Sequence, residues 1–368
     1  MTVGTLNLHT GLDGVAKWQG RYRIERSYDQ SVRVPDFVLK CVGFVCEVEH
    51  RDGGGVPSGD PHGTGFFVSV PCEHPEMQAK GACAVYLVTA KHIIDKLAKR
   101  KISLENRKIY FSVNKIGGGK TTIDRVIGNR WWYHPTDKTA DVAIAQVWPS
   151  YDADLISVGI VQLGTPELLS AVNIGIGDEV FSTGLFTPAD STRNNIPIVR
   201  HGNIAMMPDE QIETELGYAD VYLVEARSLP GISGSPVFVR PTIDFKVPHK
   251  SGHKADVFGA GLGVILLGLM QAHWDVKESE INEVFFDHDR KRGVNMGIAM
   301  VVPATKILET INQEELVAIR REGEKRATRN MVPGMDSAAP KDKKTSFTKN
   351  DFETALKKAS RKIKPNKN

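Results

Sequence analysis

Long apolar segments and excess charge of one sign are both scarce in this chain of 368 residues. No stretch has 18 uninterrupted apolar residues, so we expect no membrane-spanning helix. The most apolar stretch, GAGLGVILLGLMQA at residues 259–272, is short and rich in glycine, which favours a pair of buried strands. The chain does not start with basic residues followed by an apolar run, so we expect no secretory leader and a cytoplasmic protein.

Cysteine is also rare. No C-x-x-C pair and no H-E-x-x-H motif occurs, so nothing in the sequence supports a metal site. In a cytosolic protein we expect reduced thiols. Cys72 and Cys83 flank a predicted hairpin loop, however, and a disulfide between them stays open. The full set of cysteines is Cys41, Cys46, Cys72 and Cys83.

The net charge of +3 is too small to indicate a nucleic-acid or membrane partner by itself. Residues 336–368 hold ten Lys or Arg and four Asp or Glu, which places +6 there and −3 on the rest of the chain. Asn350 and Glu353 suit a helix cap in this tail, and a narrow apolar stripe follows them. We expect a docking helix that binds a regulatory partner, and nucleic acid stays an alternative ligand.

Short runs rich in Val, Ile, Phe and Tyr follow one another from Val38 to Pro303, and Gly, Pro, Asn and Asp separate them. Helical periodicity is scarce in this part of the chain. Many short strands without intervening helices predict an all-β fold of the barrel or sandwich class. The run is long for one antiparallel barrel, so two packed barrels fit better.

The stretch SLPGISGSPVF, residues 228–238, places Ser233 in a glycine-rich turn between apolar flanks. A serine in such a turn is usually a turn residue only. A catalytic serine needs a base, a group that orients the base, and backbone N–H donors for the oxyanion. The chain supplies both partners upstream: His92 follows the strand run VYLVTA, and Asp141 opens the strand run VAIAQV, where a carboxylate indicates a partner.

These motifs resemble those of the chymotrypsin-fold serine peptidases. TAKH is similar to their Thr-Ala-x-His motif, DVAIAQV to their Asp-x-Ala strand, and GISGSP to their Gly-x-Ser-Gly-x-Pro turn. The order His, Asp, Ser is also that of the chymotrypsin clan. GTGFFVSV, GDEVFSTG and MGIAMVVPATKI resemble strands of the bacterial HtrA-like and glutamyl-endopeptidase-like members. The resemblance spans roughly Val38 to Ile319, without a PDZ domain.

The resemblance implies a serine endopeptidase that cleaves proteins or peptides through an acyl-enzyme and needs no cofactor. Ser233 would be the nucleophile, His92 the general base and Asp141 the group that orients it. The backbone N–H groups of Gly231 and Ser233 would form the oxyanion hole. Ile232 stands where animal digestive peptidases have an Asp that pairs with a freed N-terminal amine, which argues against that activation route.

The implied fold is all-β, with two packed six-stranded antiparallel β-barrels and C-terminal helices. We expect an N-terminal extension at 1–35, a trypsin-like peptidase domain at 36–305 (barrel one about 36–150, barrel two about 170–305), a C-terminal helix at 306–330, a linker at 331–348 and a basic amphipathic helix at 349–368.

The substrate pocket is much less defined by sequence. By their place in the resemblance, the substrate-binding residues would be Arg227, Gln271, Ala272 and His273. A preference for acidic substrate residues stays open. Two other functions also stay open: a binding or scaffold protein on the same fold that has lost catalysis, and a nucleic-acid-associated factor that works through the basic tail.

Overall fold

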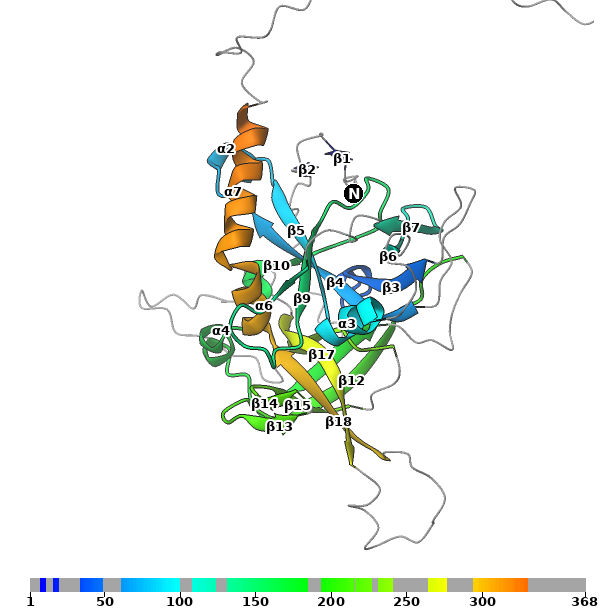
Figure 1. Ribbon diagram of the computed structural model, residues 1–368, viewed down its shortest axis with the longest axis vertical. Coiled ribbons are helices and arrows are strands. Elements are labelled where there is room, and N and C mark those ends of the chain that lie inside the picture. The colour runs from blue at the N-terminus through cyan, green and yellow to red at the C-terminus, as the bar shows by residue number, and fades with distance from the viewer. Residues whose placement is uncertain are drawn as a thin grey trace, which may run out of the picture. The chain divides into compact units, whose positions relative to one another are not determined.

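The structure is a computed structural model of the chain. It describes residues 7–10, 16–19, 34–48, 61–99, 108–123, 131–184, 193–214, 216–226, 231–240, 264–276 and 294–329. These residues form a mostly β structure with a few helices, which confirms the predicted fold class (Figure 1). The chain divides into two compact units, Met1–Arg329 and Asn330–Asn368. The predicted linker and basic tail helix lie outside the described residues.

The N-terminal half of the first unit is built on an eight-stranded sheet. Its order is β7-β6-β3-β4-β5-β9-β8, and β10 pairs in parallel with β4. Phe66 and Phe67 of β4 and Leu87 and Val88 of β5 are fully buried, because both faces of these central strands are covered. The strands are β3 (Val42–Val48), β4 (Pro61–Pro71), β5 (Cys83–Thr89), β6 (Lys108–Asn114), β7 (Lys120–Ile123), β8 (Trp132–Tyr133), β9 (Ala143–Val147) and β10 (Val158–Gly159).

The C-terminal half is a closed barrel of six strands, in the order β11-β12-β15-β18-β17-β16. Every described neighbour pair in it is antiparallel, and its interior has its own apolar core. A small hairpin, β13 (Ile212–Thr214) with β14 (Gly217–Ala219), precedes β15. The barrel strands are β11 (Glu179–Gly184), β12 (Ile198–Met206), β15 (Tyr222–Glu225), β16 (Pro236–Arg240), β17 (Ile265–Val276) and β18 (Val294–Pro303).

A shared apolar cluster joins the sheet to the barrel. Phe181 of β11 and Phe238 of β16 stack with their ring centroids 5.6 Å apart, and Phe37 meets Phe238 edge-on at 6.1 Å. All of Phe181, Phe238 and the sheet residue Phe66 belong to one continuous buried cluster. The two halves therefore share a core, as close-packed interiors require.

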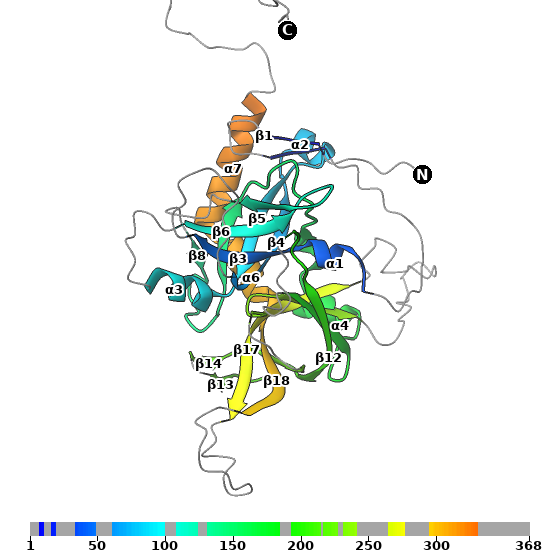
Figure 2. The same ribbon diagram turned by 90° about the vertical axis from the view of Figure 1, so that its right-hand side faces the viewer.

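The predicted helix at 306–330 is present as two helices, α6 (Ala304–Ile311) and α7 (Glu314–Arg329). Ile307, Ile311 and Leu316 are fully buried and form the face that these helices pack against the core. Figures 1 and 2 show α7 in orange running beside the first sheet. Shorter helices are α1 (Phe37–Lys40), α2 (Pro75–Ala79), α3 (Lys91–Lys99) and α4 (Pro166–Ala171), and the N-terminal region holds the hairpin β1 (Asn7–Thr10) with β2 (Ala16–Gln19).

All four cysteines are free and buried. Cys72 N donates to Ala82 O at 3.0 Å, so Cys72 and Cys83 lie close across the hairpin as thiols rather than as a disulfide. Burial raises the pKa of Cys72 to about 12 and that of Cys83 to about 11, which keeps both thiols protonated at neutral pH. Among the described residues, none of the helices has the length and apolar character needed to cross a bilayer.

Candidate active site

His92 lies at the start of α3, directly after the end of β5. Asp141 Oδ1 accepts a hydrogen bond from the main-chain N of His92 at 2.8 Å, and Asp141 Oδ2 lies 2.6 Å from His92 Nδ1. The Asp141 side chain is only 1% exposed, whereas that of His92 is 26% exposed. Because the Asp141 carboxylate accepts a hydrogen bond from Nδ1–H, the proton of the neutral imidazole stays on Nδ1 and Nε2 is an acceptor.

Ser233 lies in a tight turn just before β16. Gly231 and Gly234 have φ angles of +98° and +83°, a region that favours glycine, and Ser235 N closes the turn on Ile232 O at 2.9 Å. Gly234 N donates to Met270 O and Met270 N donates to Ser235 O, both at 2.8 Å, which ties the turn to β17.

Thr64 of β4 holds the turn from the other side. Its Oγ1 donates to Gly231 O at 3.0 Å and its N donates to Ser233 O at 2.9 Å, while its own O accepts from Thr89 Oγ1 at 2.7 Å. Thr64 is fully buried, so these bonds form away from solvent competition. The result is a continuous link from the strand end before His92 to the carbonyl groups of the serine turn.

Glycine contacts show how closely the serine turn approaches the histidine segment. A Cβ atom on Gly234 would collide with Thr64 O and would lie 2.6 Å from Thr89 Oγ1 and 3.2 Å from Ala90 N. A Cβ atom on Gly63 would collide with Ile93 Cδ1 and lie 3.2 Å from Ser233 O. The turn therefore packs on the residues that flank His92 on either side.

The structure thus pairs His92 with Asp141 and packs the turn of Ser233 against the segment that leads to His92. Among the described residues no hydrogen bond joins Ser233 Oγ to His92, and in substrate-free enzymes this bond is often long. Neither the N–H group of Gly231 nor that of Ser233 donates a hydrogen bond to a described residue.

Ile232 shows why this turn needs no buried charge. Its side chain is 2% exposed and belongs to the apolar core of the barrel. Packing therefore holds the residue before Ser233 in place, and a carboxylate in that position would require a buried partner.

The predicted substrate-binding residues are only partly described. Gln271 is 5% exposed, directly follows Met270 in β17, and its Oε1 is buried without a hydrogen bond from any described residue. Ala272 and His273 continue β17, but their side chains lie outside the described residues. Arg227 lies outside them altogether.

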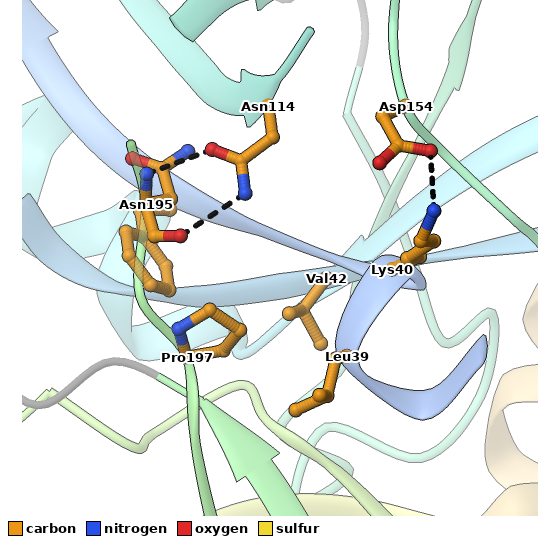
Figure 3. A pocket seen from close by; sticks show the side chains of 8 residues that line it. Leu39, Lys40, Val42, Asn114, Asp154, Asn195 and Pro197 are labelled. Carbon is orange, nitrogen blue, oxygen red and sulfur yellow. Dashed lines mark hydrogen bonds and ion pairs between the residues drawn. The ribbon is translucent and has the colours of Figure 1, made fainter. Parts of the chain in front are cut away.

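A small pocket described in the structure lies elsewhere, between α1, β6 and the segment that leads into β12 (Figure 3). Asn195 N donates to Asn114 Oδ1 at 2.7 Å and Asn114 Nδ2 donates to Asn195 O at 3.0 Å, while Lys40 and Asp154 pair at 2.8 Å. None of His92, Asp141 and Ser233 lines this pocket, so we assign it no part in the site.

Sequence patterns did not predict that Thr64 binds the serine turn or that Asp137 and Lys306 form an ion pair. Thr64 lies in the GTGF segment, and Asp137 and Lys306 lie in segments with no chemical motif of their own. Asp137 is four residues before Asp141, but only its hydrogen bonds in the folded chain show what it does.

In comparisons with known proteins, no protein-family model matches the chain, and no curated protein matches it. Among solved structures, the chain is similar to the MamO protease domain from Magnetospirillum magneticum, with 15% identity, 76% of this chain and 99% of that chain covered, and a TM-score of 0.41. It is also similar to Deg5, with 14% identity, 74% and 87% covered, and a TM-score of 0.36. Likeness this distant decides nothing about activity.

Proposed function

We propose that the protein is a serine endopeptidase that uses His92, Asp141 and Ser233 on protein or peptide substrates. The observation that carries this proposal is the pair of hydrogen bonds between Asp141 and His92. Its carboxylate is almost fully buried and binds both the main chain and Nδ1 of His92. A buried carboxylate is costly unless it is paired, and here its partner is a partly exposed imidazole in the segment next to a serine turn.

The chemistry follows from these positions. Ser233 Oγ would attack the substrate carbonyl carbon while His92 Nε2 takes the hydroxyl proton. The oxyanion would accept hydrogen bonds from the N–H groups of Gly231 and Ser233. Collapse of the tetrahedral intermediate breaks the C–N bond, and His92 gives its proton to the leaving amine. Water then hydrolyses the acyl ester by the same steps, and Asp141 stays ionised throughout.

We further propose that β17 contacts the substrate and that Gln271 takes part. The main chain of Met270 is hydrogen-bonded to both Gly234 and Ser235, so Gln271, the next residue of β17, follows directly after the contact with the serine turn. The buried Oε1 of Gln271 accepts no hydrogen bond from the described residues, and a buried acceptor without a donor costs free energy that a substrate N–H would recover. We also propose a cytoplasmic location, which suits four buried thiols.

A fluorophosphonate probe tests the nucleophile directly. Wild type should be labelled once, and Ser233→Ala should not be labelled. Ser235→Ala is the matched control in the same turn, because the Ser235 hydroxyl is fully buried and is bonded to none of the described residues. A folded wild type that is never labelled, or equal labelling of Ser233→Ala, would contradict the proposal and favour a scaffold without catalysis.

A further inference from the structure

The loop at residues 134–140 connects β8 to the strand that follows Asp141, and α6 binds this loop at two points. Lys306 Nζ lies 2.8 Å from Asp137 Oδ2, and His134 Nε2 lies 2.6 Å from Glu309 Oε2. Because Lys306 and Glu309 are three residues apart, they lie on the same edge of the helix. Helix α6 therefore contacts the start and the middle of the loop that leads to Asp141.

Inside the loop, Asp137 also binds Thr139 and Ala140, the two residues directly before Asp141. Its Oδ1 accepts from Thr139 N at 2.9 Å, from Thr139 Oγ1 at 2.6 Å and from Ala140 N at 3.3 Å. His134 Nδ1 accepts from Asp137 N at 2.9 Å, so His134 is left with Nε2 to donate to Glu309. One carboxylate oxygen thus binds the helix, and the other fixes the backbone next to Asp141.

Lys306 also reaches the half of the molecule that carries Ser233. Its Nζ lies 3.1 Å from Asp220 Oδ2, in the connection between β14 and β15. The hairpin beside it touches the same loop, since a Cβ atom on Gly217 would lie 3.5 Å from Thr139 Cγ2. The Lys306 side chain is only 15% exposed, so solvent screens this pair of contacts weakly.

We propose that Lys306 and Glu309 form a clamp that positions Asp141 against His92, with Lys306 as the main positioning residue. The proposal rests on the proposed peptidase function. Asp141 must meet two atoms of His92 at once, at 2.8 and 2.6 Å, and a small shift of its loop would lengthen both contacts. Without Lys306, Asp137 and Asp220 would also lose the cation that they share and repel each other.

The test compares Lys306→Met, Lys306→Arg and Lys40→Met. Lys40 pairs with Asp154 at 2.8 Å, remote from the Asp141 loop, so its variant controls for the loss of a Lys–Asp pair. The first readout is the downfield proton resonance of the His92 Nδ1–H···Asp141 bond, which needs no catalysis. The second is the rate of fluorophosphonate labelling per folded molecule.

Lys306→Met should shift or broaden the resonance and slow labelling about tenfold to a hundredfold, the cost of a small misplacement of a catalytic group. Lys306→Arg should retain the resonance and most of the labelling rate, and Lys40→Met should match wild type in both readouts. An unchanged resonance and rate in Lys306→Met would overturn the clamp. A change in thermal stability alone, with the resonance intact, would overturn it too, because it would show a merely structural role.

Glu309→Ala gives a second route should Lys306→Met fail to fold. The Glu309 side chain is 53% exposed, so its loss should leave the fold intact while freeing His134, and the resonance should shift in the same direction by less. An unshifted resonance in this variant would overturn the clamp. A wild type that shows the resonance but is never labelled would overturn the peptidase alone, and the resonance of the variants would still decide the clamp.

Discussion

At Gly234 two separate physical reasons require glycine. Its φ of +83° is unfavourable for other residues, and a Cβ atom would collide with Thr64 O. Both effects act in the turn that presents Ser233, so this residue links the stability of the fold to the geometry of the site.

Gly117 offers a comparison in which only the first reason applies. Its φ is +85°, and a Cβ atom there would meet no atom within 4 Å. Gly117→Ala should therefore cost about 1–2 kcal/mol in the free energy of unfolding, the strain of a left-handed residue. Gly234→Ala should cost clearly more, because steric overlap in a packed interior adds to that strain.

Urea denaturation of the two variants measures both free energies. Equal losses would show that the turn around Gly234 can shift to accept a methyl group, and would contradict the close packing on Thr64.

At the residue scale, local motifs predict a candidate triad but not the residues that contact it. The order of His92, Asp141 and Ser233 could be inferred because each lies in a short local motif. The contact of Thr64 with the serine turn could not be inferred, because its partner Gly231 is 167 residues away in the chain. Such a contact exists only once the sheet and the barrel have packed together.

Between α6 and α7, one buried arginine explains where the helix breaks. Arg320 is 8% exposed and its guanidinium donates to Ile311 O at 2.7 Å, to Tyr86 Oη at 3.1 Å and to Asn312 Oδ1 at 3.1 Å. The carbonyl at the end of α6 thus finds a donor from the middle of α7. The sequence predicted one continuous helix, since arginine is usually an exposed residue and suggests no such cap.

Arg320→Met should lower the free energy of unfolding by about 2–4 kcal/mol, because buried acceptors lose a charged donor. Arg326 on the same helix is the matched control. It pairs with Glu322 one turn away, and both side chains are more than half exposed. Arg326→Met should cost at most about 0.5 kcal/mol.

Thermal denaturation of these two variants distinguishes the buried contact from the exposed one. A similar, small effect of both substitutions would mean that α7 docks through its apolar residues alone.

At the scale of the whole molecule, Asp137 makes the free energy of unfolding depend on pH. Burial alone would raise the pKa of Asp137, but hydrogen bonds from Lys306 and Thr139 outweigh burial and lower it from 3.8 to about 2. A carboxyl whose pKa is lowered by folding stabilises the fold above its unfolded pKa, and this contribution is lost as the pH falls through the folded pKa. The relevant window is therefore between about pH 4 and pH 2.

Asp137→Asn should be less stable than wild type above about pH 4, by roughly 1–2 kcal/mol, and the difference should shrink as the pH approaches about 2. Asp154→Asn is the control, because its pair with Lys40 has side chains that are 41% and 35% exposed and contributes little. Urea midpoints across this pH range measure the difference. A constant difference at every pH would contradict the role of the Asp137 charge.

The mostly β architecture could be predicted from local sequence patterns, whereas the strand order of the sheet and of the barrel could not. Alternating short apolar runs from β3 to β18 indicate strands whatever their order, because each run buries side chains against a sheet. The order β11-β12-β15-β18-β17-β16 and the link from Lys306 to Asp137 and Asp220 depend on contacts between distant segments. Local sequence patterns do not predict contacts between segments that are far apart in the chain.

Digestion of an unbiased peptide library by wild type and by Ser233→Ala tests the central claim most directly. We expect that wild type cleaves a defined set of bonds, that the residues around these bonds reveal its substrate preference, and that Ser233→Ala cleaves none of them. Cleavage of the same bonds by Ser233→Ala, or no cleavage by a folded wild type at any bond, would contradict the assignment of Ser233 as the nucleophile of an active peptidase.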